Sequence, residues 1–304
     1  MKKQLIESTP NQSIDELRQL FLQEGYLLLK NLFPKTKVEE ARILIFEELL
    51  RQGWVCEKAG RLFACEPVHR IGSPSFFKCI QSLISLEMLH TFSYHPRLNQ
   101  LLAGILQTTV YPHPRKMIRL GYPYAMNPLD STPAHQDVFY VRGEPDTLTV
   151  WIPLGAYTYV EGGLEVVPRS HLKGLYPTRA NEEGRFNCTA AEGGLDQLEW
   201  HGTDYEWGDA LIMHALTLHQ AVKNKSQEFR ISLDTRFSSS LGHLNEEQLL
   251  PPYYPHVQAW HVFNQHWKNP HLFDPPATLQ IEAATVSLET VMQRPSLIEA
   301  YVTH

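Results

Sequence analysis

The sequence has few cysteines, and none lies at the spacing that a structural metal site uses. Its 304 residues include only four, at Cys56, Cys65, Cys79 and Cys188. No two form a C-x-x-C pair, which argues against a zinc ribbon, and four in a chain of this length are too sparse for a disulfide scaffold. We therefore expect buried free thiols, the usual state in a reducing cytosol.

Long apolar runs and an excess of positive charge are also missing. No run approaches the roughly 20 residues of a membrane span, and the opening MKKQLIESTPNQ lacks the apolar core of a signal peptide. The ending Tyr-Val-Thr-His is not an S-K-L-type peroxisomal address. Lys and Arg number 27 against 33 Asp and Glu, a net charge of −6, which disfavours nucleic acid and anionic membranes as partners. We expect a cytoplasmic protein, monomeric or homodimeric, that acts on a small molecule.

Residues 1–108 carry mainly helical patterns. Ser13 followed by Glu16 is a capping-box pattern, Gly25 is a typical helix end, and 35–52 repeats its apolar residues at helical spacing. Residues 75–108 show the same spacing. We predict that this part of the chain is helical support for a sheet, with one strand at 26–32.

After about residue 108 the pattern changes to short β-rich runs separated by turns. Such runs at near-regular spacing predict a mainly β fold with flanking helices, a sandwich or a jelly-roll (cupin-like) barrel. We predict one domain over 1–304: a jelly-roll core at 109–237, a long insertion at 176–205, and a tail at 238–304 that caps the barrel or forms a dimer contact. The predicted strands are Met117–Tyr122, Ala134–Val141, Leu148–Leu154, Leu164–Val167, Ala210–His214 and Arg230–Phe237.

His135-Gln136-Asp137 is the strongest chemical signal. In an extended strand, residues two apart face the same side, so the imidazole and the carboxylate could reach one metal ion. A distant histidine would complete two histidines and one carboxylate, a set that binds Fe(II) and leaves three positions open. The distal candidates are His214 and His219, which would face opposite ways on one strand. We favour His219, because His214 lies in the apolar run LIMHALTL and reads as a core histidine.

Arg230 follows His219 by eleven residues, in a predicted strand. Its rigid guanidinium fork suits a carboxylate held by two parallel hydrogen bonds. Arg236 is a rival on the same face, although a salt bridge to Asp234 or to another acid is the simpler reading of that residue. A metal triad beside a carboxylate clamp is what 2-oxoglutarate next to iron requires.

These residues also carry a family resemblance. PAHQDVFY (133–140), TVWIPLG (149–155), EGGLEVVPRSHLKG (161–174) and HQAVKNKSQEFRIS (219–232) resemble the phytanoyl-CoA dioxygenase family, with a weaker match at EGYLLLKNLF (24–33). The resemblance implies a double-stranded β-helix, Fe(II), 2-oxoglutarate as co-substrate and O2 as oxidant.

Position by position, the resemblance implies that His135, Asp137 and His219 bind iron. It implies that Arg230 holds the far carboxylate of 2-oxoglutarate and that Trp151 flanks the co-substrate. One departure is that the H-x-S often found at the distal histidine reads His-Gln-Ala here, so the hydroxyl is absent. Ser232 is the candidate to replace it.

Asp137 bears on the reaction type as well. Related halogenases have Ala or Gly at this position so that chloride can bind iron, and a carboxylate therefore favours oxygenation. Further candidates come from flanking strands. Ile118 is a candidate for the wall of the co-substrate pocket, and its alternative role is that of an ordinary core residue. The candidate substrate contacts are Arg119, Tyr122, Tyr140 and Arg142.

We therefore expect a 2-oxoglutarate-dependent non-haem iron dioxygenase that oxidises an unactivated C–H bond of a small metabolite, by hydroxylation or oxidative dealkylation in natural-product tailoring. Two alternatives stay open. One is an acyl-CoA hydroxylase of phytanoyl-CoA type, and the other is a non-catalytic protein that binds metal and 2-oxoglutarate on the same fold.

Overall fold

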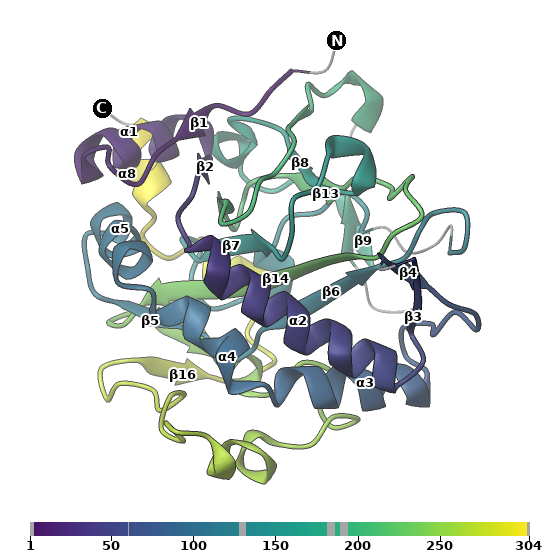
Figure 1. The fold of residues 1–304 in the computed structure, drawn as a ribbon. Helices are drawn as coiled ribbons and strands as arrows, with labels where there is room; N and C mark the ends of the chain where they lie inside the picture. The colour runs from purple at the N-terminus through teal and green to yellow at the C-terminus, as the bar shows by residue number, and fades with distance from the viewer. Residues whose placement is uncertain (1–2, 60, 128–131, 181–185, 189–193, 303–304) are drawn as a thin grey trace.

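Two β-sheets and a layer of helices make up the protein (Figure 1). The computed structural model describes residues 3–302, except 60, 128–131, 181–185 and 189–193. The helices are α1 (Ile14–Glu24), α2 (Lys35–Arg51), α3 (Pro74–Ile84), α4 (Glu87–His90), α5 (Pro96–Leu106), α6 (Val138–Val141), α7 (Leu288–Met292) and α8 (Leu297–Val302). None of these described helices has both the length and the apolar character needed to cross a bilayer.

The larger sheet has seven strands in the order β1-β2-β12-β7-β14-β5, with β6 pairing to β14. All of its pairs are antiparallel except β1 with β2. Its strands are β1 (Glu7–Ser8), β2 (Tyr26–Leu29), β5 (Val110–Pro112), β6 (Met117–Gly121), β7 (Leu148–Pro153), β12 (Ala210–His214) and β14 (Arg230–Ser239).

A three-stranded sheet, β11-β8-β13, lies against the larger one. Leu164 and Val166 of this sheet share an apolar cluster with Trp151, Leu211 and Met213 of the larger sheet. The remaining strands form hairpins or short pairs away from this contact. The strands outside the larger sheet are β3 (Val55–Lys58), β4 (Arg61–Ala64), β8 (Leu164–Val166), β9 (Thr178–Ala180), β10 (Phe186–Cys188), β11 (His201–Gly202), β13 (His219–Ala221), β15 (His243–Asn245) and β16 (Gln280–Glu282).

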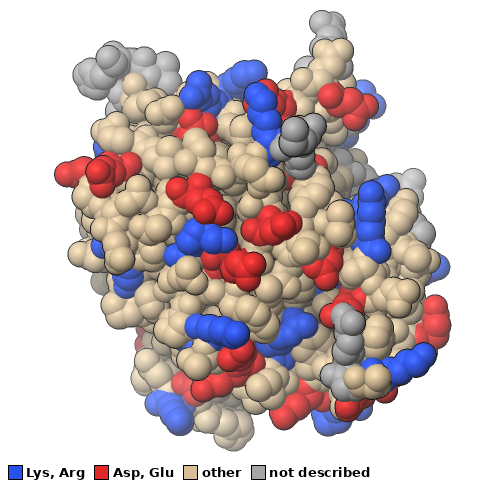
Figure 2. All heavy atoms as spheres, turned by 45° about the horizontal axis from the view of Figure 1, so that its top comes forward, with Lys and Arg blue, Asp and Glu red and all other residues tan. Residues whose placement is uncertain are grey.

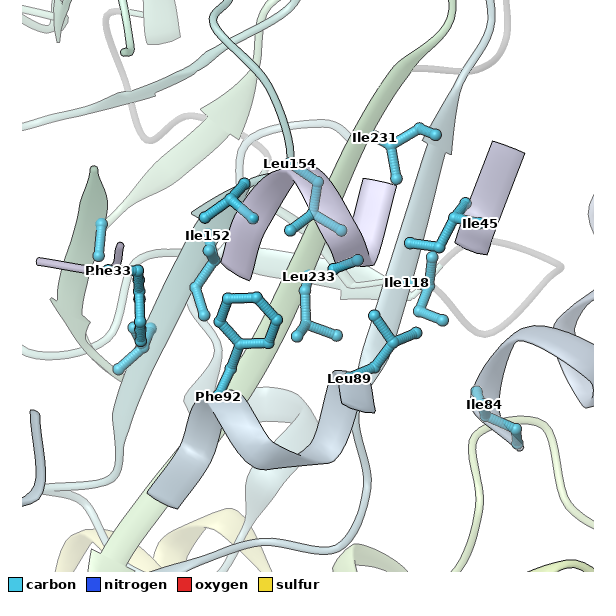
Figure 3. Packing of buried hydrophobic residues seen from close by; sticks show 14 of the residues in the cluster. Phe33, Ile45, Ile84, Leu89, Phe92, Ile118, Ile152, Leu154, Ile231 and Leu233 are labelled. Carbon is cyan, nitrogen blue, oxygen red and sulfur yellow. The ribbon is translucent and has the colours of Figure 1, made fainter. Parts of the chain in front are cut away.

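The main hydrophobic core lies between the larger sheet and the helices. In Figure 3, Leu89 and Phe92 from the helical layer lie beside Ile118, Ile152 and Leu233 from the strands. Helices α2 and α3 run across this face of the sheet, as Figure 1 shows. Burial of this apolar surface fixes one face of every central strand and leaves the other face for the small sheet and for polar side chains.

Strand β14 follows this rule over its whole length. Residues two apart share a face of a strand, and the odd-numbered Ile231, Leu233 and Phe237 lie in the core on the helical side. The even-numbered residues therefore point to the space between the two sheets. They are Arg230, Ser232, Asp234, Arg236 and Ser238, all of them buried.

The helix signals at the start and end of α1 are confirmed, whereas β1, β3 and β4 are strands that the sequence analysis did not predict in this region. Ser13 and Glu16 form a capping box at the start of α1. Gly25 ends that helix at φ +80°, and a Cβ there would lie 2.3 Å from Nδ1 of His171. The position thus requires glycine both for its backbone and for the space above it. His171 is a structural residue: its Nε2 pairs with the carbonyl of Leu22 at 3.0 Å.

Three expectations are not met. Residues 134–141 are not a strand: His135 makes a single bridge to His219, and Val138–Val141 form the one-turn helix α6, because Val138 and Val141 pack against Ala215 and Leu216. Cys56 and Cys65 are disulfide-bonded across the β3–β4 hairpin, which places their Cα atoms 5.9 Å apart, whereas Cys79 and Cys188 are free and buried as expected. Among the described strands, the two sheets do not join into a closed barrel.

The tail after residue 238 packs along the helical layer and along one end of the larger sheet. Its aromatic residues Trp260, Trp267 and Phe273 surround His90 of α4, and β15 pairs with β16 within the tail. Part of the predicted insertion 176–205 lies outside the described residues. The described part includes β9, β10 and β11.

Candidate functional site

Two histidines and one aspartate converge between the sheets. His135 forms an antiparallel β-bridge with His219 of β13: each donates its backbone N–H to the other's carbonyl, at 3.0 and 3.1 Å. Their ring centroids are 4.2 Å apart. Asp137 completes the group, and one ligand atom from each residue lies within 4.8 Å of the others. Among the described residues, this is the one cluster of three or more such side chains that could hold a metal ion.

The histidine rings are oriented for metal binding through Nε2. Nδ1 of His135 lies 2.8 Å from the carbonyl of Pro133, and Nδ1 of His219 lies 2.9 Å from that of Thr217. A carbonyl can only accept, so each Nδ1 carries the proton and each Nε2 presents a lone pair. Backbone carbonyls that hold the distal nitrogen in this way are typical outer partners of metal-binding histidines. The donor set therefore fits a divalent ion such as Fe(II).

Asp137 is held by two buried partners. Its Oδ2 accepts a hydrogen bond from Oγ1 of Thr149 at 2.5 Å, and its Oδ1 lies 3.1 Å from Nη2 of Arg236. Burial by itself would raise the pKa of this carboxyl group. The charge of Arg236, with the hydrogen bond and charges of the two histidines, instead holds the pKa of Asp137 well below its usual range. Asp137 is therefore a carboxylate, the form that binds metal.

The distal histidine is His219 and not His214. His214 lies in β12, where its Nε2 is 3.0 Å from Asp146 and its Nδ1 accepts from the backbone N–H of Leu216. It is a core histidine, as its apolar surroundings indicated. His219 faces the site, and burial and the charge of His135 lower its pKa to about 4. The imidazole is therefore neutral and available as a ligand at neutral pH.

Arg230 lies next to the triad in a small cavity. Its side chain is buried, and Nη1 donates to Oγ of Ser232 at 2.6 Å. Trp151 lines the same cavity, and no described residue accepts a hydrogen bond from its indole Nε1. A buried indole N–H without an acceptor is costly, so a ligand that brought one would be stabilised there. These residues are the ones that the family resemblance assigned to 2-oxoglutarate.

Gly121 makes room for Arg230. It is the direct partner of Arg230 in the β6–β14 pairing, and a Cβ at this position would lie 3.2 Å from Nε of Arg230. Any larger residue would press on the guanidinium group. The arginine is therefore positioned by Ser232 on its own strand and by the absence of a side chain on the neighbouring strand.

Arg119 and Asp234 form a second ion pair in the site. Nε of Arg119 lies 2.8 Å from Oδ2 of Asp234 on the adjacent strand, and both residues line the small cavity. Asp234 therefore pairs with Arg119, and Arg236 pairs with the ligand Asp137. The salt bridge expected for Arg236 exists, and its acid is Asp137 of the candidate metal site.

A larger cavity of about 610 Å³ adjoins the triad and shares His135, Arg119 and Arg230 with the small one. Most of its wall is aromatic or apolar, and pockets of this size bind ligands the size of a drug molecule. Its aromatic lining residues are Trp54, His69, Phe76, Phe77, Tyr122, Tyr140, Tyr253 and Tyr254. Tyr253 and Tyr254 belong to the tail, so the segment after residue 238 contributes part of the cavity wall.

The structure places the remaining predicted residues differently. Tyr122 and Tyr140 line the larger cavity, and Tyr140 lies edge-on to His135 with ring centroids 5.6 Å apart. Ile118 belongs to the helical-side core and also touches the larger cavity, but it does not line the small cavity around Arg230. Arg142 ends α6 and is not among the residues that line either cavity.

Several site residues were not found from the sequence. Thr149, Gly121 and Asp234 act through partners on neighbouring strands, so their roles depend on the register of β14 with β6 and β7. The one available signal was parity: Asp234 lies an even number of residues from Arg230, which places both on the same face.

Comparisons with known proteins agree with this site. Residues 21–232 match the family described as phytanoyl-CoA dioxygenase (PhyH). The chain is 33% identical over 170 residues to 1-deoxypentalenic acid 11-beta-hydroxylase of Streptomyces exfoliatus, covering 52% of this chain and 59% of that protein. It is 30% identical over 125 residues to the peroxisomal phytanoyl-CoA dioxygenase of Homo sapiens, covering 36% and 34%. The chain thus spans well under two thirds of either relative.

Solved structures share the fold. The epimerase SnoN, in complex with Fe3+, alpha ketoglutarate and nogalamycin RO, superposes with a TM-score of 0.57 at 17% identity, covering 76% of this chain and 85% of that chain. The non-heme alpha ketoglutarate dependent carbocyclase SnoK from nogalamycin biosynthesis gives 0.53 at 19% identity, covering 79% and 89%. The match over 21–232 takes in the helical layer, the triad and Arg230, and the chain therefore belongs to the phytanoyl-CoA dioxygenase (PhyH) family.

Proposed function

We propose that the protein is a 2-oxoglutarate-dependent non-haem iron dioxygenase that oxidises a C–H bond of a small metabolite. The observation that carries this proposal is the convergence of His135, Asp137 and His219 beside buried Arg230, between the larger sheet and the three-stranded sheet. When bound, iron(II) with 2-oxoglutarate supplies the oxidative chemistry: O2 is consumed, the co-substrate becomes succinate and CO2, and a C–H bond is oxidised.

The chain's own residues bind and orient the reactants. His135 and His219 offer Nε2, and Thr149 and Arg236 hold the carboxylate of Asp137. Arg230, steadied by Ser232, would hold the far carboxylate of 2-oxoglutarate as a charge-assisted pair. The indole N–H of Trp151, which has no described acceptor, would donate to the same co-substrate.

The larger cavity supplies the place for the substrate. It reaches His135, so a molecule seated there lies beside the metal ligands. Its aromatic wall excludes water from the oxidised carbon, and orientation together with water exclusion is the protein's main contribution in enzymes of this kind. Asp137 occupies the carboxylate position that related halogenases leave empty, so we propose oxygenation rather than halogenation.

We propose a small natural product as the substrate, hydroxylated or oxidatively dealkylated. The Streptomyces relative is named a hydroxylase of 1-deoxypentalenic acid, and a cavity of about 610 Å³ suits a compact metabolite. Acyl-CoA is the second candidate, favoured by the human relative's name. On the face in Figure 2, Lys and Arg are interspersed with Asp and Glu, and this view offers no broad basic area for the phosphates of CoA.

An anaerobic titration of the metal-free protein with Fe(II) and 2-oxoglutarate tests the proposal. We expect a weak visible absorption band from the iron–co-substrate complex, lost in His219→Ala and weakened in Arg230→Met. Arg97→Met is the matched control, because Arg97 is half-buried, lines neither cavity and bonds to the carbonyls of Pro10 and Gln12. We also expect succinate to form only when Fe(II), 2-oxoglutarate and O2 are all present.

The alternatives predict other results. A band without any succinate, across a panel of small terpenoid and polyketide substrates and phytanoyl-CoA, would favour the non-catalytic binding protein. Turnover of phytanoyl-CoA but of no small metabolite would favour the acyl-CoA hydroxylase. Succinate formation that survives His135→Ala would refute the ligand assignment.

A further inference from the structure

The larger cavity contains an arginine that the chemistry at the metal does not use. Arg115 lies between β5 and β6, and its guanidinium group reaches two carbonyls of the tail: Nε to Leu250 at 3.3 Å and Nη2 to Pro251 at 3.5 Å. Both bonds are long for an N–H donor. Among the described residues, no carboxylate lies within 4.0 Å of Arg115 to form an ion pair. The group therefore keeps hydrogen-bonding capacity and charge that the protein does not neutralise at close range.

A second cation lies close to it. Arg236 also lines the cavity, and no described residue accepts a hydrogen bond from its buried Nε. Burial lowers the pKa of Arg115; the charge of the exposed Glu247 raises it and that of Arg236 lowers it further, with a net lowering. Two guanidinium groups that repel each other across a partly desolvated space would both be stabilised by an anion between or beside them.

The rest of the cavity wall indicates which chemical group accompanies the anion in such a ligand. Trp54, Phe76, Phe77 and Tyr253 form an apolar wall. A compact hydrocarbon body would bury its surface there, at roughly 25 cal/mol for each Å² removed from water. The cavity thus combines an apolar wall with a cationic end.

We propose that the substrate is a small carboxylic acid and that Arg115 binds its carboxylate, with the hydrocarbon body against the aromatic wall. This inference rests on the proposed function, because it names the substrate class of the same site. A carboxylate matches the chemistry better than a phosphate. One guanidinium fork pairs with one carboxylate, and Glu247 beside it disfavours a more highly charged anion. Arg115 is a specificity residue and takes no part in binding iron or 2-oxoglutarate.

Calorimetry with matched probes tests the proposal. The full-length protein, saturated with Fe(II) and 2-oxoglutarate under anaerobic conditions so that Arg230 is occupied, is titrated with cyclohexanecarboxylic, 1-adamantanecarboxylic and dehydroabietic acids. Each acid is compared with its neutral primary alcohol. We expect at least one acid to bind about tenfold more tightly than its alcohol, which is the usual worth of a hydrogen bond to a charged group.

The variants assign that preference to a residue. Arg115→Met should remove the preference for acid over alcohol and leave the affinity for the alcohol within about twofold, and Arg115→Lys should keep part of it. Arg97→Met is the surface control and should behave like the wild type. The visible band of the iron–2-oxoglutarate complex should be unchanged in Arg115→Met, which shows that the variant is folded and loaded.

Three results would overturn the proposal: equal affinity for acid and alcohol in the wild type, an acid preference that persists in Arg115→Met, or no binding by any of the three acids. Coenzyme A that binds and depends on Arg115 would also overturn it, since a phosphate would then be the anion. The proposed function fails separately. If no visible band forms but the metal-free protein still binds acids through Arg115, the dioxygenase assignment is wrong and the anion site stands.

Discussion

Replacing Arg236 by methionine should lower the free energy of unfolding of the metal-free protein and raise its affinity for a divalent metal ion. Arg236 and Asp137 form a buried ion pair at 3.1 Å, with side-chain exposures of 6% and 3%. Removing one partner of such a pair costs about 3–5 kcal/mol because a charge is left buried. Thr149 still donates to Asp137, and the adjoining cavity admits water, so we expect the lower end, about 3 kcal/mol.

A bound divalent ion should reduce the stability that the Arg236→Met variant loses. The ion supplies the positive charge that Asp137 has lost, so we expect a cost of only about 1 kcal/mol in the metal-loaded variant. By linkage the difference, about 2 kcal/mol, must appear as tighter metal binding, roughly 30-fold. Arg236 is thus expected to oppose metal binding while it keeps the empty site folded.

The assay uses Co(II), whose absorption reports coordination without oxygen chemistry. Urea unfolding of the metal-free wild type and Arg236→Met gives the stability loss, and Co(II) titration gives the affinities. Arg42→Met is the control, because Arg42 is an arginine bonded to Leu154 and Tyr157 away from the triad. It should lose stability without a change in Co(II) affinity. Equal or weaker Co(II) binding in Arg236→Met would refute the reasoning and would show that Arg236 serves to orient Asp137.

Three further changes test other parts of the structure. Gly121→Ala should weaken 2-oxoglutarate binding about tenfold with the fold intact, because the new Cβ would lie 3.2 Å from Nε of Arg230; an unchanged Kd in the visible titration would contradict this. Lys116 is buried, and burial with the charge of Arg236 lowers its pKa to about 7 from 10.5. The native protein loses this proton near pH 7 while the unfolded chain keeps it to about pH 10.5, so wild-type stability should rise with pH in that window. Lys116→Met should therefore be more stable at pH 7, by at most on the order of 4–5 kcal/mol, and its advantage should shrink towards pH 10; a difference in urea unfolding that is flat with pH would count against it. Gly25→Ala should lower the thermal midpoint, because its Cβ would meet His171 at 2.3 Å and its φ is +80°; a midpoint equal to the wild type's would mean that the α1–β2 turn relaxes freely.

The sequence predicted the elements whose signals are local. Ser13 and Glu16 set the start of α1, and the alternation along β14 placed Arg230 and Arg236 on one face. The structure also brings His135, Asp137 and His219 together, the three residues that the sequence analysis grouped as candidate metal ligands.

The reasoning behind that group was only partly right. The apolar run Val138–Val141 reads as a strand, yet it packs as one helical turn against Ala215 and Leu216, and tertiary contacts decided its conformation. Asp137 reaches the site from the residue before that turn, where Thr149 and Arg236 hold it. Both partners depend on strand register, which a single sequence does not reveal. The Cys56–Cys65 disulfide depends on the β3–β4 hairpin, which we did not predict from the sequence.

Strand β14 fixes the spacing between two arginines of the candidate site. Arg230 and Arg236, six residues apart on one face, set the separation between the proposed co-substrate clamp and the partner of the proposed metal ligand Asp137, about 20 Å along the strand at roughly 3.3 Å per residue. Inserting or deleting one residue between them would shift the alternation of the strand, so that one of the two arginines would point into the hydrophobic core. Apolar side chains would then point to the face that holds the candidate metal site. Changes of length in β14 should therefore be lethal to activity in any descendant of this chain. New substrate preferences should arise instead in the segments around Trp54 and Tyr253, which line the larger cavity and do not determine the spacing of the two arginines.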